Sequence, residues 1–293
     1  MRTFPTVGAD TQEVFLPLER LEARCRICGV TTKLTKEHVP PSSAFNDDAA
    51  KVHTADDWLK RAPDGELPGG KLQHGGIWGY TLCATCNNLT GGYYGEEYKW
   101  WALAIVNAFA EAGVNARQQI DESEYIPDGP LRLTDQKGRG ARPGAFVRQA
   151  LSIMCTLSAP FDLAGSYPVL RRIILDRAAA ALPDGMSLGL TGYVGGYPRI
   201  AGPQIVVHEV EGSWHCIMEL AVPPLALLMV LGGNAPFQHV FDLTPFSLVP
   251  PNERREVEGR LAVAIGHTMY PGDYRTKTMI ERQAAENERA AST

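Results

Sequence analysis

Two Cys-x-x-Cys pairs, at positions 25–28 and 83–86, enclose the dipeptide Glu37-His38. Two cysteines with this spacing can direct both thiolates to one ion, and two such pairs complete a tetrahedral zinc shell. Four protein ligands leave no open coordination position, so zinc in such a shell is structural and takes no part in catalysis. The sequence therefore predicts one structural zinc ion held by Cys25, Cys28, Cys83 and Cys86.

Disulfide bonds are the main alternative use of these cysteines. They form in secreted proteins, whose chains begin with an apolar signal segment, but residues 1–21 contain no such segment. The apolar stretch at 220–231 is interrupted by Pro223-Pro224 and is too short to cross a bilayer. We therefore expect reduced thiols, a cytoplasmic location and no membrane partner.

Three short motifs in the first third of the chain carry a resemblance to a known family. They are CRICG at 25–29, TKEHVPP at 35–41 and LCATCN at 82–87. Together they resemble the zinc-clamped, four-cysteine branch of the HNH endonucleases, over roughly residues 25–98. The resemblance implies a ββα-metal module of the HNH or treble-clef type, built from a hairpin and a helix. It also implies that His38 is the general base and that Glu37 holds a catalytic divalent metal ion on the scissile phosphate.

The third catalytic position of that family has no direct counterpart in this chain. The family often places an Asn a few residues before the second cysteine pair, but residues 77–81 contain neither Asn nor His. Asn87, directly after Cys86, is the best replacement, because an amide oxygen is a hard ligand for a divalent metal. Two alternatives remain open: Asn87 is a helix cap without a catalytic role, or His74 in a glycine-rich stretch takes its place.

Phosphodiester hydrolysis requires a base that activates water and a positive charge near the phosphoryl oxygens. Imidazole suits the first task because its unperturbed pKa lies near neutrality. Mg²⁺ or Mn²⁺ suits the second, because hard oxygen ligands hold these ions while leaving positions for phosphate and water. Neighbouring side chains on an extended strand point to opposite faces, so Glu37 and His38 converge only at a strand end or bend. Pro40 and Pro41 predict such a stop.

A length of 293 residues is enough for two units. We assign residues 1–115 to the HNH-type module, with an insertion at about 46–76 that includes a short helix at 54–61. Residues 116–293 are predicted to form a mixed α+β domain with an antiparallel sheet. In the first unit, Gly91-Gly92 predicts a break or a delayed start of the helix whose apolar stripe begins near Glu96.

The second unit shows alternating helical and extended patterns. The predicted helices lie at 145–158, 166–182 and 274–290. The predicted strands lie at 187–195, 204–211, 214–222 and 225–231, with a further extended stretch at 240–249. Short turns separate the four strands, so we expect them to follow one another as an antiparallel meander.

The formal net charge of −5 argues against a protein whose whole surface grips nucleic acid. Affinity would have to come from local patches or from an oligomer. One candidate patch follows the connector between the two units, although a solvated loop is the alternative interpretation. Its residues are Arg132, Lys137, Arg139, Arg142 and Arg148.

The sequence thus predicts a divalent-metal-dependent HNH endonuclease that acts on DNA. The second unit is expected to target, regulate or oligomerise it, a layout similar to that of effector nucleases in bacterial defence. The strands in 204–231 and the terminal helix offer surfaces for a homo-oligomer, unless they are ordinary core. The alternative from another class is a non-catalytic zinc module that binds nucleic acid or protein, in which Glu37-His38 is only a turn.

Overall fold

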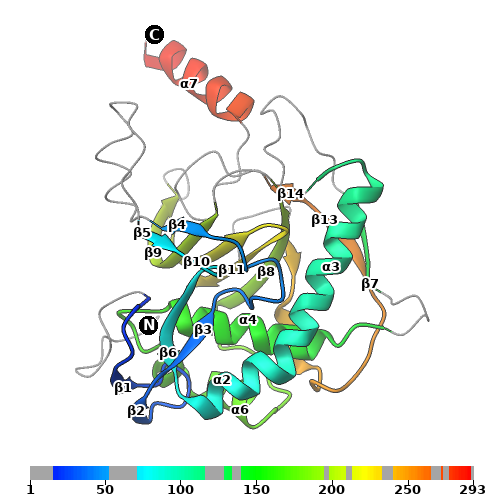
Figure 1. The fold of residues 1–293 in the computed structure, drawn as a ribbon. Coiled ribbons are helices and arrows are strands. Elements are labelled where there is room, and N and C mark those ends of the chain that lie inside the picture. The colour runs from blue at the N-terminus through cyan, green and yellow to red at the C-terminus, as the bar shows by residue number, and fades with distance from the viewer. Residues whose placement is uncertain are drawn as a thin grey trace.

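The computed structural model describes residues 16–52, 71–115, 129–133, 140–194, 198–208, 213–232, 240–264, 272 and 277–291. The predicted helix at 54–61 and the basic residues Lys137 and Arg139 lie outside these ranges. Within them the chain forms a mixed α+β fold whose sheets are largely antiparallel (Figure 1). The predicted fold class is confirmed at that level.

Three two-stranded antiparallel sheets form the N-terminal part of the fold. The pairs are β1 (Glu22–Arg24) with β2 (Thr31–Lys33), β3 (Thr35–His38) with β6 (Trp78–Leu82), and β4 (Ala50–Val52) with β5 (Lys71–Gln73). The β4–β5 hairpin lies between β3 and β6 in the chain, within the segment predicted to be an insertion.

A continuous helical segment follows β6. It begins as α2 (Ala84–Asn88), widens into the π-helix η2 (Leu89–Tyr94) and continues as α3 (Gly95–Glu111). Of the two alternatives predicted from Gly91-Gly92, a break is wrong, because the chain forms a wider helical turn there, and a delayed start agrees with α3, which begins at Gly95. The fully buried side chains of Tyr94 and Trp101 anchor the segment, so packing outweighs the low helix propensity of glycine.

The largest sheet carries the strands of the C-terminal part. It contains β8 (Met186–Tyr193), β9 (Arg199–His208), β10 (Ser213–Val222), β11 (Leu225–Leu231) and β12 (Phe241–Asp242), in the spatial order β12-β8-β11-β10-β9. The short β14 (Val263–Ala264) runs parallel to β8. The stretch predicted to be extended at 240–249 is so only in part: β12 is a strand, and the 3-10 helix η3 (Thr244–Leu248) occupies half of the stretch.

The predicted meander is right for β9, β10 and β11, but β8 lies beside β11 and not beside β9. Every residue of β11 is buried. A strand that is apolar on both faces is stable only when both faces are covered and a neighbour pairs with each edge. Because residues 216–222 of β10 are buried as well, this stretch and β11 are core and offer no surface for self-association.

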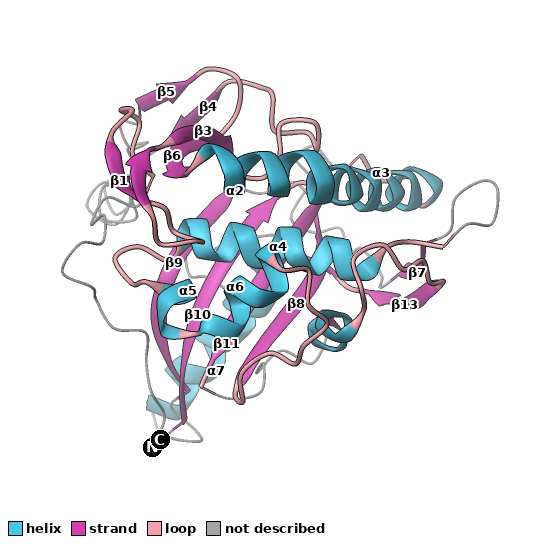
Figure 2. Ribbon diagram, turned by 90° about the horizontal axis from the view of Figure 1, so that it is seen from below, coloured by secondary structure: helices cyan, strands magenta, loops and turns pink. Residues whose placement is uncertain are grey.

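The helix α4 (Pro143–Leu157) occupies the centre of the molecule, and all of its 15 residues are buried. Figure 2 shows it between the large sheet and the layer that contains α2 and α3. A helix that is buried all round must contact partners on every side. The short helices α5 (Leu163–Ser166) and α6 (Pro168–Leu175) follow it, and β7 (Gly129–Leu133) pairs with β13 (Val257–Leu261).

One cluster of buried side chains extends from Cys25 to Leu261 and includes residues of both predicted units. The rings of Trp101 and Phe146 stack with centroids 4.1 Å apart. The two units therefore share buried contacts, while the boundary at residue 115 stays a prediction. The terminal helix α7 (Lys277–Ala291) was predicted, and Figure 1 shows it at the edge of the molecule.

Arg148 on α4 is fully buried, although it was predicted to belong to a surface basic patch. Its guanidinium donates hydrogen bonds to five backbone carbonyl groups from segments far apart in the chain. The acceptors are the carbonyl oxygens of Gly144, Ile173, Arg177, Ala178 and Val249. Arg142 of the same predicted patch pairs with Glu97, with 2.9 Å between Nε and Oε2. Both arginines are therefore structural.

Arg148 also explains why α6 ends at Leu175, since the alanine-rich sequence up to residue 182 favours a longer helix. The carbonyl groups of Arg177 and Ala178 turn to the buried guanidinium. The N–H of Ala180 donates to the carbonyl of Ser247 at 3.3 Å. Tertiary hydrogen bonds therefore outweigh local helix propensity in this segment.

We expect Arg148→Met to lower the free energy of unfolding by about 3 kcal/mol or more, because the carbonyl groups stay buried and lose their donor. Urea unfolding followed by circular dichroism measures the change. Arg172→Met, at an exposed position of α6, is the matched control and should change stability by less than about 0.5 kcal/mol. Similar effects of the two substitutions would contradict the structural role of Arg148.

Candidate functional site

The sulfur atoms of Cys25, Cys28, Cys83 and Cys86 lie within 4.8 Å of one another. The Sγ atoms of Cys28 and Cys83 are 3.8 Å apart, and all four cysteines are free of disulfide bonds. Zinc–sulfur bonds of about 2.3 Å in a tetrahedron place the sulfur atoms about 3.8 Å apart. The cluster could therefore hold a metal ion, and zinc suits both its ligands and its spacing.

The first cysteine pair lies on a tight turn between β1 and β2. The Gly29 N–H donates to the Cys25 carbonyl at 2.9 Å, and the Cys25 N–H donates to the Val30 carbonyl at 2.9 Å. Gly29 has a φ angle of 79°, a left-handed conformation that glycine adopts without the steric cost of a side chain. The turn brings both thiols of the pair to one side.

The second pair begins the helix α2, where Cys83 is the N-cap residue and its sulfur accepts the Cys86 N–H at 3.5 Å. Helix N-termini favour thiolates. The hydrogen bond with Cys86 lowers the pKa of Cys25 to about 5, and the same contact raises the pKa of Cys86. Thiols this close can all ionise only beside a cation, which supports metal binding.

The strand β3 presents different side chains to its two faces. Lys36 is exposed and His38 is half-buried on one face, whereas Glu37 between them is only 4% exposed. This is the alternation of an extended strand, and the strand continues through His38. The stop predicted from Pro40 and Pro41 is right, because β3 ends at His38, but Glu37 and His38 still face opposite sides of the strand.

Glu37 points into the core toward α4. Its Oε2 atom accepts hydrogen bonds from the hydroxyl groups of Thr81 at 2.9 Å and Thr156 at 3.0 Å. Burial raises the pKa of Glu37 to about 7, although the two hydroxyl hydrogen bonds act in the opposite direction. In this structure Glu37 fastens the β3–β6 hairpin to α4, and its carboxylate does not lie beside His38.

His38 ends β3 directly opposite Trp78 of β6. Burial lowers the pKa of His38, and the charge of Lys36 lowers it further, while a hydrogen bond with the backbone of Gly75 acts in the opposite direction. The net effect favours the neutral imidazole at pH values near neutrality. That form can accept a proton from water.

Asn87 on α2 is fixed against β3. Its Nδ2 atom donates to the Lys36 carbonyl at 2.7 Å and to the Thr35 hydroxyl at 3.0 Å. A carbonyl only accepts, so this contact determines which end of the amide faces the strand. The oxygen Oδ1 therefore faces the other way, toward Gly91. Because Asn87 lies inside α2 and Cys83 caps it, the alternative that Asn87 is a helix cap is wrong.

His74, the other candidate for the third position, is exposed just before β6. Its carbonyl accepts a hydrogen bond from the indole Nε1 of Trp78 at 3.3 Å. Within the described ranges, the four cysteines are the group of His, Cys, Asp and Glu side chains that is close enough to hold a metal. The structure therefore does not bring His74 into a ligand cluster.

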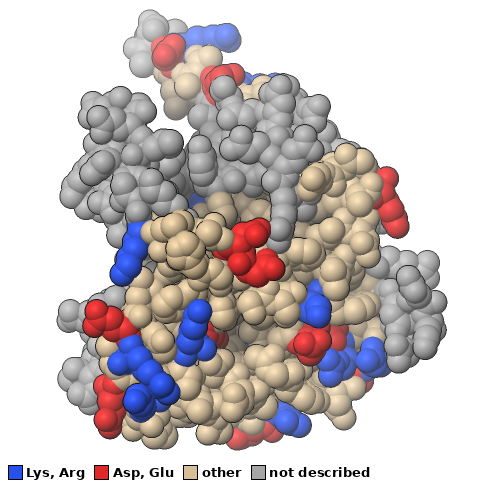
Figure 3. Space-filling model, viewed as in Figure 1, with Lys and Arg blue, Asp and Glu red and all other residues tan. Residues whose placement is uncertain are grey.

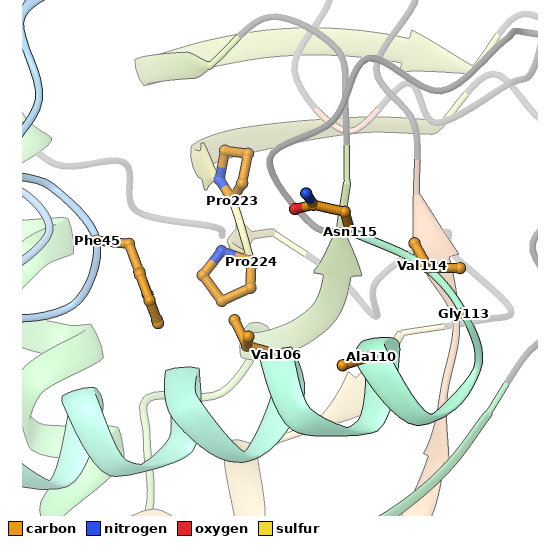
Figure 4. A pocket seen from close by; sticks show the side chains of 8 residues that line it. All are labelled: Phe45, Val106, Ala110, Gly113, Val114, Asn115, Pro223 and Pro224. Atoms are coloured by element: carbon orange, nitrogen blue, oxygen red, sulfur yellow. The ribbon is translucent and has the colours of Figure 1, made fainter.

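A separate recess of about 380 Å³ lies between the C-terminal end of α3 and the turn that joins β10 to β11. Figure 4 shows the Phe45 ring on one side, across from Pro224 and Val106. Phe45 has a φ angle of 68°, which is uncommon for a bulky residue. The lining is apolar apart from Asn115 and contains no acid or base, so the recess offers contact area but no catalytic group.

Sequence reasoning missed two contacts of the residues that flank His38 on β3. Thr156 is 119 positions from Glu37, and no local pattern predicts their hydrogen bond. The contact of Lys36 with the ring of Trp78 was also missed. Part of this arrangement could have been predicted. Lys36 and His38 are two positions apart, so strand alternation places both side chains on one face.

No protein-family model, curated protein or solved structure matches this chain. In the part of the chain that the structure describes, no helix has the length and apolar character that crossing a membrane requires. Function must therefore be inferred from the site itself.

Replacing Cys83 with Ser should remove the metal and lower the thermal stability, because zinc binding contributes to the folding free energy. Metal analysis of the purified wild-type chain is expected to give about one zinc ion per chain. Cys216→Ser, at a buried position of β10 outside the cluster, is the matched control and should keep its zinc. A fully folded wild-type chain without zinc would exclude the clamp.

Glu37 should make stability depend on pH. Burial raises its pKa from 4.5 to about 7, so the stability it contributes is present below pH 4.5 and is lost as the pH rises through about 7. Glu37→Gln keeps an oxygen acceptor for Thr81 and Thr156 but does not titrate. As the pH rises from 4.5 to about 7, the free energy of unfolding of the wild type should fall relative to that of Glu37→Gln, by up to about 1.4 kcal/mol per pH unit.

Urea unfolding of both proteins at several pH values measures this difference. Glu96→Gln, at an exposed position of α3, is the matched control and should show no such trend. A constant difference between wild type and Glu37→Gln would mean that the carboxyl group titrates as it does in water.

Proposed function

We propose that the chain is a divalent-metal-dependent endonuclease of the HNH type that carries a structural zinc ion and acts on DNA. The observation that carries the proposal is the set of groups along the single strand β3 of the β3–β6 hairpin. A histidine with a lowered pKa ends β3, and the helix that directly follows β6 fixes an amide against the same strand. This order of hairpin and helix, closed by four cysteines, is the order expected of a ββα-metal nuclease.

In this proposal His38 takes the proton of the attacking water, which its neutral imidazole is suited to do. Asn87 would hold the catalytic ion through Oδ1, while its Nδ2 stays bonded to Lys36 and Thr35. Mg²⁺ or Mn²⁺ bound there would supply the positive charge that stabilises the phosphoryl oxygens. The two hydrogen bonds of Nδ2 fix the amide before substrate arrives, so its orientation costs nothing further on binding.

Glu37 takes a different part in the proposal from the one that the family resemblance implies. To bind an ion on the His38 face, its carboxylate would have to leave Thr81 and Thr156. We propose that Glu37 holds the hairpin on α4 and thereby positions His38. Its role as a metal ligand stays a prediction, which cleavage by Glu37→Gln tests directly.

The distribution of charge supports local contact with nucleic acid. Figure 3 shows basic side chains over the corner that β1, β2 and β3 form, with acidic side chains among them. The exposed basic residues of this corner are Arg20, Lys33 and Lys36, and the exposed acidic ones are Glu19 and Glu22. A single module would therefore bind few phosphates, and self-association through the exposed helix α7 would add more. Light scattering of the full chain tests that step.

One observation favours the alternative of a non-catalytic zinc module that binds nucleic acid or protein. The carboxylate of Glu37 is buried beneath the strand, so the His38 face has one hard ligand fewer than the resemblance implies. Such a module would bind nucleic acid without cutting it in any divalent metal. Cleavage and binding assays on the same protein distinguish the two functions.

The central test is cleavage of plasmid DNA with added Mg²⁺ or Mn²⁺, with EDTA added as a control. His38→Ala should lower the rate by about 10²- to 10⁴-fold, the usual contribution of a general base. It should keep zinc and DNA binding, because only interactions of the transition state are lost. Asn87→Ala should cut more slowly and recover part of its activity at higher metal concentration.

His74→Ala is the matched control, because His74 is the rival for the third position and is exposed. It should cut like the wild type. Loss of cleavage in His74→Ala but not in Asn87→Ala would assign the third catalytic position to His74. Undiminished cutting by His38→Ala would show that His38 is not the general base.

A further inference from the structure

The exposed side of the β3–β6 hairpin carries a lysine whose position is fixed by an aromatic ring. Lys36 and His38 share this face, and Trp78 is the residue opposite His38 on β6. The Nζ atom of Lys36 lies 4.3 Å from the centroid of the Trp78 ring. The ammonium group is therefore held along the hairpin toward His38, where a free lysine side chain would extend into water.

The ring of Trp78 is itself held in place. Its Nε1 atom donates to the His74 carbonyl at 3.3 Å, and Tyr80 meets it edge to face with centroids 5.9 Å apart. These contacts define the orientation of the indole. A free lysine side chain has many rotamers and loses conformational entropy when it binds a ligand. A fixed ring beneath the ammonium group restricts these rotamers beforehand, so less entropy is lost on binding.

The contact of Lys36 with Trp78 is not an ion pair. An indole ring attracts an ammonium group but carries no opposite charge that would neutralise it. Ion pairs neutralise other basic residues of the fold: Arg142 pairs with Glu97, and Arg199 pairs with Glu219. None of the ion pairs formed within the described ranges includes Lys36. Lys36 therefore presents a positive charge to the solvent beside His38.

The backbone of the same residue supports the site from the other side. The Lys36 carbonyl accepts the amide of Asn87 at 2.7 Å. One residue thus connects a fixed amide, a fixed cation and, two positions along the strand, an imidazole. The amide meets the beginning of β3, and the Lys36 ammonium group leans toward Trp78, opposite His38 at the end of the strand.

We propose that Lys36 is a phosphate-binding residue of the nucleic-acid site and that Trp78 is the residue that positions it. Lys36 would contact a non-bridging oxygen of a backbone phosphodiester through a charge-assisted hydrogen bond. The inference rests on the proposed function, because that function identifies the anion near His38 as a nucleic-acid backbone. It adds a substrate contact that neither the cysteine motifs nor the Glu37-His38 dipeptide implies.

The test is the affinity of the full chain for a DNA duplex of about 20 base pairs, measured by fluorescence anisotropy at about 50 to 200 mM salt without added Mg²⁺ or Mn²⁺. Lys36→Met keeps most of the aliphatic stem and removes the charge. It should weaken binding by about tenfold at low salt and reduce the salt slope by about 0.9, the value for one phosphate contact. Lys36→Arg keeps a cation and should retain most of the affinity.

Lys33→Met is the matched control, because Lys33 is an exposed lysine on β2 of the same corner. The inference expects a clearly smaller effect from it. If Lys36→Met and Lys33→Met change the affinity and the salt slope equally, Lys36 is no more than part of a diffuse charge and the inference is overturned. Zinc content is measured for each variant, so that loss of the fold is not taken for loss of a contact.

A double-mutant cycle tests the role of Trp78. Trp78→Leu should weaken binding by about two- to fivefold, the value of an exposed cation–π contact, and Trp78→Phe should weaken it less because a ring remains. In the Lys36→Met background Trp78→Leu should have no further effect. Additive effects would overturn the positioning role of Trp78.

Failure of this inference and failure of the proposed function give different results. If the chain binds DNA through Lys36 but cuts nothing with Mg²⁺ or Mn²⁺, the phosphate contact is supported and the nuclease function is contradicted. If the chain cuts DNA and Lys36→Met leaves its DNA affinity unchanged, the nuclease function is supported and the phosphate contact is contradicted.

Discussion

The four-cysteine cluster is the constraint on which the rest of the site depends. It joins a turn near the N-terminus to the first turn of α2, and the two strands of the β3–β6 hairpin lie between these ends of the chain. Once the sulfur atoms are brought together, α2 must run beside β3. The hydrogen bond from Asn87 to the Lys36 carbonyl follows from that proximity. The amide of Asn87 is thereby fixed on the strand that ends at His38, although the two residues are far apart in the chain.

The local parts of this site could be predicted from the sequence, because their causes are local. The spacing within each cysteine pair suits a metal site, and strand alternation already implied that Glu37 and His38 would face opposite ways. The destination of Glu37 could not be predicted, because its partner Thr156 belongs to a helix that is distant in the chain. Only the packing of α4 beneath the hairpin decides that the carboxylate is buried.

The same distinction applies to the fold. The existence of α4, α7 and the strands β9 to β11 followed from periodicity, since each pattern is contained within its own segment. The place of β8 beside β11 and the early end of α6 depend on long-range pairing and on the buried guanidinium of Arg148. Competition between a local preference and a distant partner cannot be judged from one segment alone.

The hydrogen bond between Thr156 and Glu37 gives the C-terminal part of the chain a mechanical connection to the face that carries His38. Thr156 lies in the last turns of α4, and α4 also contacts the large sheet. A displacement of α4 along its axis would pull on the carboxylate and tilt the strand whose next residue is His38. The residue beside His38 is thus tied directly to the helix that packs on the large sheet, on the side of the strand that faces away from solvent.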